Sequence, residues 1–116
     1  MTPQELKDRT KRFAVSIIQL SRELPTTLDG RTIGGQLIRC GTSVAANYRA
    51  SCRARSRAEF IAKLGTVEEE ADETLFWIEL AVDSQLVSID RARALLKEAD
   101  ELTAIFVASL KTAKRQ

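Results

Sequence analysis

Apolar residues return along the chain at alternating steps of three and four positions, the spacing that places side chains on one face of an α-helix. No stretch alternates apolar and polar residues as a half-buried strand does. The pattern therefore predicts helices over about residues 3–24, 31–54, 57–84 and 89–113. The first predicted helix carries the clearest stripe, which consists of Leu6, Thr10, Phe13, Ile17, Leu20 and Leu24.

Capping patterns support these helix starts. Thr2 and Glu5 are spaced as a capping box, with a proline directly after the threonine. Ser56 and Glu59 repeat the spacing before the third helix, and Ser88 is a typical N-cap residue for the fourth. Because the loops between the helices are short, residues 1–116 are predicted to form one all-α domain, an up-down-up-down four-helix bundle.

The second predicted helix contains Gly34, Gly35 and Gly41 in its first half. Each glycine costs about 1 kcal/mol relative to alanine in a helix interior. We therefore expect another segment to approach this helix closely at these positions.

The third predicted helix has apolar residues on two sides. One stripe faces the expected core and comprises Phe60, Leu64, Val67, Ala71, Leu75, Ile78 and Val82. A second group lies on nearly the opposite side and comprises Ala62, Gly65, Phe76 and Leu80. A small bundle cannot bury both sides, so the second group predicts a homo-oligomer interface. The alternative is scattered exposed apolar residues, which are normal on protein surfaces.

Composition narrows the classes of function. The chain has 116 residues, 44% hydrophobic and 29% charged, which is ordinary globular usage. It has no apolar run of about 18 residues and no apolar leader, so we expect no membrane contact and a cytoplasmic location.

Histidine is absent, which removes Ser-His and Cys-His catalysis and histidine metal sites. We expect no cofactor, no metal and no catalytic residue. Cys40 and Cys52 lie too far apart on one helix, about 18 Å, to form a disulfide.

Charge is unevenly distributed although the net charge is only +2. Residues 31–57 carry six basic and no acidic side chains, whereas residues 58–84 carry one basic and eight acidic side chains. Arginine rows can form bidentate hydrogen bonds with phosphates, and Tyr48 nearby could stack on a base. The candidate nucleic-acid contacts are Arg39, Arg49, Arg53, Arg55 and Arg57, with Lys111, Lys114 and Arg115 as a second basic group. Alternatively, the arginines pair with the acidic helix of the same or a neighbouring subunit.

The acidic run allows one further hypothesis. Glu69, Asp72 and Glu73 could hold magnesium, and the run superficially resembles the Glu-Glu-x-x-Glu motif of helical nucleotide pyrophosphatases. Such enzymes need a second acidic pair on a facing helix, for which only Glu98 and Glu101 are available. A solvated or paired acidic face is the commoner arrangement.

Polar residues on adjacent turns of the second helix suggest a structural network. Gln36, Ser43 and Asn47 lie beside its apolar stripe, where asparagine has a poor helix propensity. We expect them to form hydrogen bonds between helices or across subunits.

The block "QLIRCGTSVAANYRASCRARSRAEF" resembles the small four-helix-bundle proteins of the 23S rRNA intervening-sequence family. The family pattern is matched without a gap by Gln36, Arg39, Ser43, Asn47, Ser56, Glu59 and Phe60. The family's later glutamate aligns with Glu73, which joins the expected polar network. Two departures indicate a diverged subgroup: Glu69-Glu70 replaces a Gly-Ser pair, and residues 47–51 read Asn-Tyr-Arg-Ala-Ser instead of Asn-Ile-Ala-Glu-Gly.

The resemblance implies a ring-shaped homo-oligomer, typically a pentamer, and no enzymatic activity is established for the family. A similar accessory protein of diversity-generating retroelements is thought to bind nucleic acid through a basic surface. The leading hypothesis is therefore a non-enzymatic, oligomeric bundle that binds RNA or a ribonucleoprotein. An assembly module whose arginines meet the acidic helix of a neighbouring subunit is the alternative, and a magnesium-dependent nucleotide hydrolase comes third.

Overall fold

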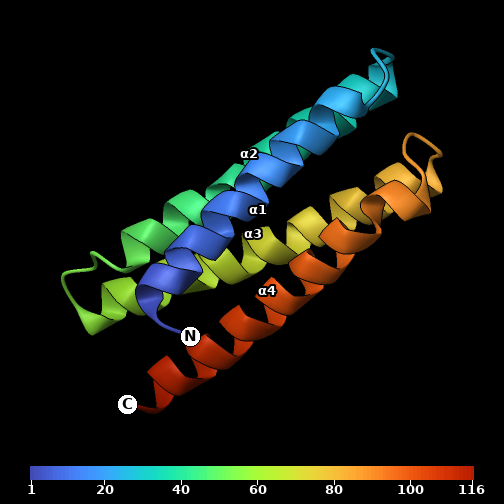
Figure 1. Cartoon of the computed structure of the whole chain (residues 1–116). Helices are drawn as coiled ribbons and strands as arrows, with labels where there is room; N and C mark the ends of the chain where they lie inside the picture. Colours follow the sequence, from blue (N-terminus) through green and yellow to red (C-terminus); the bar gives the residue numbers. More distant parts are fainter.

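The computed structural model describes all 116 residues as four helices without strands. They are α1 (Pro3–Glu23), α2 (Leu28–Ser51), α3 (Arg57–Asp83) and α4 (Ile89–Arg115). Consecutive helices run antiparallel along a molecule of 46 × 21 × 20 Å, and both chain ends lie at the same end of it (Figure 1). The predicted all-α class is confirmed.

Hydroxyl side chains cap each helix N-terminus. Thr2, Ser56 and Ser88 accept hydrogen bonds from the backbone N–H three residues further on, each at 3.1 Å. Thr27 accepts one from Gly30 N–H at 3.2 Å. This last cap starts α2 at Leu28, three residues before the predicted start, because Thr27 caps the helix upstream of Arg31.

The other differences from the predicted bounds concern helix C-termini. α2 ends at Ser51 rather than near residue 54, because the N–H groups of Arg53 and Ala54 bond to carbonyls only three residues back, which closes the helix with a tight turn. α4 continues to Arg115, past the predicted end at residue 113. Its last turn carries Lys114 and Arg115, and cations are favourable at the negative end of the helix dipole.

The core lies between α2 and α3, with α1 covering α2 and α4 covering α3, while α1 and α4 touch much less. Its fully buried side chains come from all four helices and include Ile17, Leu20, Leu37, Val44, Leu64, Val67, Ile78, Leu102 and Phe106. α1 and α4 are also joined by ion pairs. Arg9 binds Glu98 and Glu101, and Arg91 binds Glu23.

The three glycines that predicted a close approach, Gly34, Gly35 and Gly41, have different surroundings. A Cβ at Gly41 would lie 2.8 Å from Cγ2 of the buried Ile17, so α1 and α2 approach closely there, as expected. A Cβ at Gly34 would make ordinary contacts, and one at Gly35 would meet nothing within 4 Å. Close approach therefore explains Gly41 but not Gly35.

Candidate nucleic-acid interface

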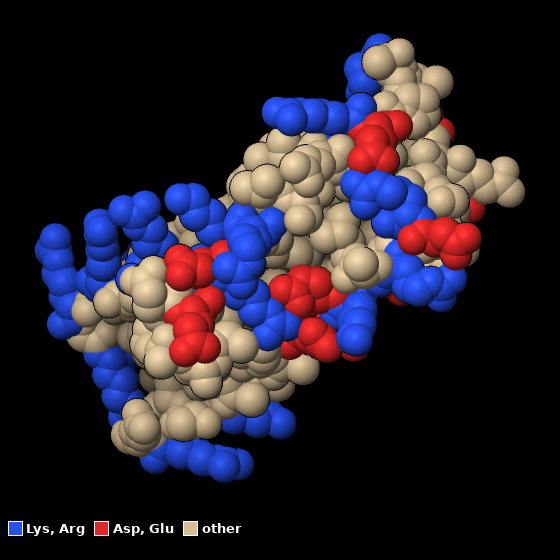
Figure 2. Space-filling view, viewed as in Figure 1, with Lys and Arg blue, Asp and Glu red and all other residues tan.

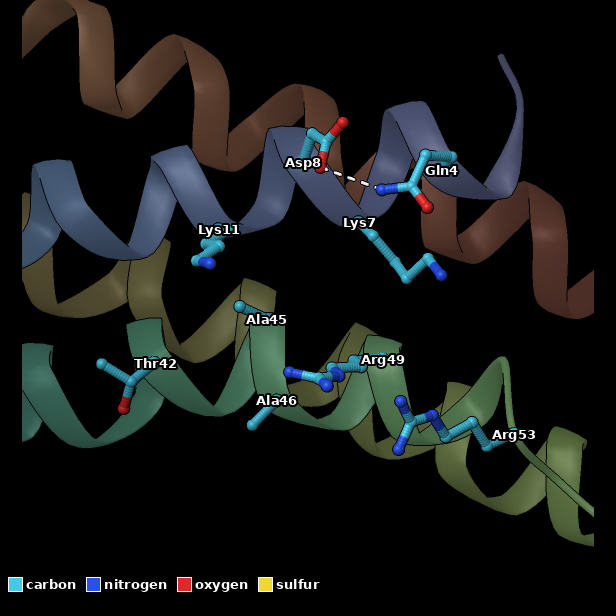
Figure 3. Close-up of a pocket in the computed structure, with 9 residues that line it drawn as sticks. All are labelled: Gln4, Lys7, Asp8, Lys11, Thr42, Ala45, Ala46, Arg49 and Arg53. Carbon is cyan, nitrogen blue, oxygen red and sulfur yellow. Dashed lines mark hydrogen bonds between the residues drawn. The ribbon is translucent and has the colours of Figure 1, made fainter.

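A hollow of about 440 Å³ lies between the first half of α1 and the second half of α2. α1 contributes Lys7 and Lys11 to one side, and the other side carries Arg49 and Arg53 (Figure 3). Small residues form the floor between them, namely Thr42, Ala45 and Ala46. Gln4 and Asp8 complete the lining and bond to each other, with 3.1 Å between Gln4 Nε2 and Asp8 Oδ1.

Helix geometry explains why these cations share one hollow. Lys7 and Lys11 are four residues apart on α1, so they project from one side of that helix. Arg49 lies in the last turn of α2, and Arg53 follows in the tight turn that closes the helix. Because α1 and α2 are antiparallel neighbours, the start of α1 lies beside the end of α2 (Figure 1). The short side chains of Ala45 and Ala46 leave the space between the two rows open.

A second hollow of about 400 Å³ continues the first toward the start of α3. It shares Arg49 and Arg53 with the first hollow and adds Arg55, Glu59 and Lys63. We call the two hollows together the basic groove. Its charged lining residues are six cations, Lys7, Lys11, Arg49, Arg53, Arg55 and Lys63, and two acids, Asp8 and Glu59, which leaves a net charge of +4.

None of the six cations of the basic groove forms an ion pair within the chain, because the ion-paired basic residues are Arg9, Arg39, Arg91 and Arg93. Figure 2 shows Lys and Arg side chains gathered toward the end of the molecule that holds both chain termini. The groove therefore carries uncompensated positive charge, which attracts polyanions.

Three of the eight predicted nucleic-acid contacts line the groove: Arg49, Arg53 and Arg55. The structure gives Arg39 another role. Its guanidinium contacts the carboxylates of Glu70, at 3.1 Å, and Glu73, and also donates to Gln36 Oε1 at 2.9 Å. Arg39 therefore joins α2 to α3, as the charge-pairing alternative predicted for the arginines.

Arg57 also has a partner within the chain. Its Nε and Nη2 atoms donate to the carbonyl oxygen of Ala113, at 3.1 and 2.8 Å. This contact fastens the end of α4 to the start of α3. Lys111, Lys114 and Arg115 are exposed on the last turns of α4 and lie outside the lining of the basic groove.

Sequence reasoning missed the lysines of the groove. Lys7 and Lys11 lie in a segment whose charges nearly cancel, and Lys63 lies in the acidic third helix. The only signal for the first pair was its spacing of four residues on a helix. Nothing in the sequence indicates that this pair faces Arg49 and Arg53.

Tyr48 cannot stack on a bound base, contrary to the suggestion from the sequence. Its side chain is only 7% exposed, and its ring packs against Phe106 with 5.6 Å between ring centroids. Burial raises the pKa of the Tyr48 hydroxyl well above its ordinary value, so the residue stays uncharged. Tyr48 is a core residue beneath the groove.

The expected polar network is divided into two separate units. Asn47 Nδ2 donates to the Ser43 hydroxyl at 2.7 Å and to its carbonyl at 3.1 Å, entirely within α2. Gln36 belongs instead to the Arg39 cluster, which includes Glu73. Only this second unit connects two helices.

The acids of the hydrolase hypothesis are not brought together. Glu98 and Glu101 face Arg9 of α1, which donates to Glu98 at 2.8 and 2.6 Å, and that hydrogen bond is the main cause that raises the pKa of Arg9. Glu73 contacts Arg39. No group of three or more His, Cys, Asp or Glu side chains is placed to hold a metal ion.

The residues of the predicted oligomer interface differ in exposure. Phe76 is 52% exposed and Ala62 is exposed, whereas Gly65 and Leu80 are half-buried.

Cys40 is buried and Cys52 is exposed, and neither is in a disulfide, as their spacing predicted. No helix is long and apolar enough to cross a membrane.

Four antiparallel helices with a groove of unpaired cations define a small helical protein with a basic surface groove. Residues 4–108 match the model of the 23S rRNA-intervening sequence protein family, and the chain belongs to that family. The resemblance inferred from the sequence is confirmed.

A solved structure from Bacteroides thetaiotaomicron is similar over 96% of this chain and 99% of its own, with 31% sequence identity and a TM-score of 0.87. That protein is described as one of unknown function from the S23 ribosomal protein family. No curated protein matches the chain significantly. These comparisons show the family and the fold of the chain. The function must be argued from the basic groove.

Proposed function

We propose that this protein is a non-catalytic binding protein that holds RNA, alone or in a ribonucleoprotein, through phosphate contacts in the basic groove. One observation carries the proposal: six cations without ion-pair partners line one continuous groove. The family description refers to 23S rRNA and the solved relative's to a ribosomal protein family, which favours RNA as the polyanion. An RNA partner also fits the cytoplasmic location that we propose.

The side chains suit phosphate recognition. Arginine presents a planar fork that bonds two phosphate oxygens at once, and lysine acts as a compact charge with three donors. Lys7, Lys11, Arg49 and Arg53 surround the first hollow, so a phosphate there meets cations from two sides (Figure 3). Each contact releases a counterion, which makes the affinity depend steeply on salt.

The test is RNA binding by fluorescence anisotropy as a function of salt concentration. Six contacts predict a slope of about −5 in log K against log salt for a duplex probe. Replacing Lys11 and Arg49 by glutamine should make that slope shallower by about 2. Glutamine at Arg22 and Lys97 is the matched control, because both cations are exposed, unpaired within the chain and outside the groove.

Two outcomes would overturn the proposal. One is the absence of RNA binding at about 50 mM salt, where phosphate contacts are strong. The other is an equal loss of binding in the groove variant and in the control, because net charge alone would then account for the affinity.

A second candidate is assembly of copies of this chain, in which the basic groove of one subunit meets the outer face of α3 of the next. Glu69 and Asp72 are exposed on α3 without ion-pair partners, and Phe76 is 52% exposed one turn further on. This face therefore combines negative charge with apolar surface, which suits a basic partner. Repetition of such a head-to-tail contact gives a closed ring if the rotation closes, and we propose a pentamer.

Light scattering of the protein in solution distinguishes the two candidates. Replacing Arg49 and Arg53 by glutamate should reduce the measured mass if the groove contacts α3 of a neighbour. If the mass is unchanged while RNA binding is lost, the groove binds RNA and does not contact a neighbouring subunit, and this mode of assembly is refuted.

A further inference from the structure

We propose that the basic groove takes the phosphate backbone of a base-paired RNA duplex rather than the bases of a single strand. The inference rests on the proposed function and names the form of RNA that the groove suits. It follows from what the lining contains and from what it lacks.

The groove offers no surface on which bases can stack. None of its lining residues is aromatic. Tyr48, the only aromatic residue of α2, is buried against Phe106. Proteins that bind single strands without sequence preference rely on stacking of successive bases on aromatic side chains, and each stacked base is worth about tenfold in affinity. A single strand bound in this groove therefore gains no affinity from base stacking.

The two uncharged polar side chains of the lining, Thr42 and Gln4, already donate hydrogen bonds within the chain. Thr42 donates its hydroxyl hydrogen to the carbonyl oxygen of Ile38 at 2.6 Å. Gln4 donates to Asp8. Reading a base edge requires free donors and acceptors in a matching pattern. Most of the donors that remain free belong to ammonium and guanidinium groups, which bind phosphates.

The first hollow lies between two packed helices, which favours a partner that is itself ordered. The helices on its two sides, α1 and α2, approach closely where Gly41 meets Ile17. The Cα atoms of Lys7 and Lys11, four residues apart on α1, are separated by about 6 Å along the helix axis. A flexible single strand loses conformational entropy when its phosphates are fixed, whereas the backbone of a duplex is already ordered. The duplex also carries about one charge per 1.7 Å of its axis.

The size of the groove defines how a duplex would lie. Its two hollows, of about 440 and 400 Å³, are too small to enclose a double helix. The backbone of one strand therefore sits between the lysines of α1 and the arginines of α2, while the paired bases remain outside. Such binding reads the shape of the duplex and is insensitive to its sequence.

The experiment compares an RNA hairpin with an unstructured oligonucleotide of the same number of phosphates, at one salt concentration. We expect the hairpin to bind at least ~10-fold more tightly, because the single strand lacks base stacking on the protein, and one stacked base is worth about tenfold in affinity. This preference should exceed that of an octalysine peptide, which has charge without a groove. 2-Aminopurine placed in the single strand should keep its fluorescence, because no base stacks on the protein.

Equal or tighter binding of the single strand, a preference no larger than that of octalysine, or quenching of 2-aminopurine would each overturn the inference. If the single strand is preferred but Lys11→Gln/Arg49→Gln still weakens binding more than the Arg22→Gln/Lys97→Gln control does, the proposed function stands and only the duplex preference fails. If neither probe binds, the proposed function and the inference fail together.

Discussion

Replacing Gly41 by alanine should leave the protein less stable than the same change at Gly35, which should stabilise it. At Gly41 the new Cβ would lie 2.8 Å from Ile17 Cγ2 and 3.1 Å from its Cβ and Cγ1. Ile17 is fully buried, and a β-branched side chain has few alternative rotamers, so α1 must shift. At Gly35 the new Cβ would meet nothing within 4 Å.

Both substitutions gain about 1 kcal/mol of helix propensity. Overpacking at Gly41 costs about 1–3 kcal/mol, so Gly41→Ala should be neutral to about 2 kcal/mol less stable than the parent. Gly35→Ala keeps the full gain. The propensity gain cancels between the two variants, and their difference isolates the overpacking cost of about 1–3 kcal/mol.

Urea unfolding followed by circular dichroism measures both variants against the parent protein. At roughly 4 °C per kcal/mol for a chain of this size, the melting temperatures should also differ by at least 4 °C. Equal stability of Gly41→Ala and Gly35→Ala would refute the close approach of α1 and α2 at Gly41. Ile17→Ala in the Gly41→Ala background should cost less than Ile17→Ala alone, because the new methyl group fills part of the vacated space.

Three further predictions concern charged side chains. Arg39→Gln should leave RNA affinity nearly unchanged, in contrast to Arg49→Gln, because Arg39 already binds carboxylates of α3; parallel salt titrations test this. Arg57→Ala should speed amide hydrogen exchange in the last turns of α4, because the Ala113 carbonyl loses its donor; unchanged exchange there would contradict this role. The hydrogen bond from Arg91 lowers the pKa of Glu23, so this pair should stabilise the fold above about pH 4.5 and lose that effect as pH falls through the lowered pKa. Glu23→Gln should therefore reduce stability at pH 7 but not at low pH, and an equal effect at both pH values would count against the pair.

The sequence by itself determined the helices and the family. Capping residues such as Thr2, Ser56 and Ser88 act on backbone groups three residues away, and apolar stripes repeat within a few turns. These signals are local, so they can be read without knowing the fold. The errors in the helix bounds were also local, as at Thr27, whose cap starts α2 three residues before the predicted start.

Only the tertiary structure decided which cations are available. Arg39 and Arg49 belong to the same basic segment, yet one pairs with α3 while the other lines the groove. Arg57 bonds to Ala113, which lies 56 residues away in the sequence. Lys7 and Lys11 join the groove only because α1 packs antiparallel to α2. The partner of a long side chain depends on which helix faces it, and core packing of all four helices sets that arrangement.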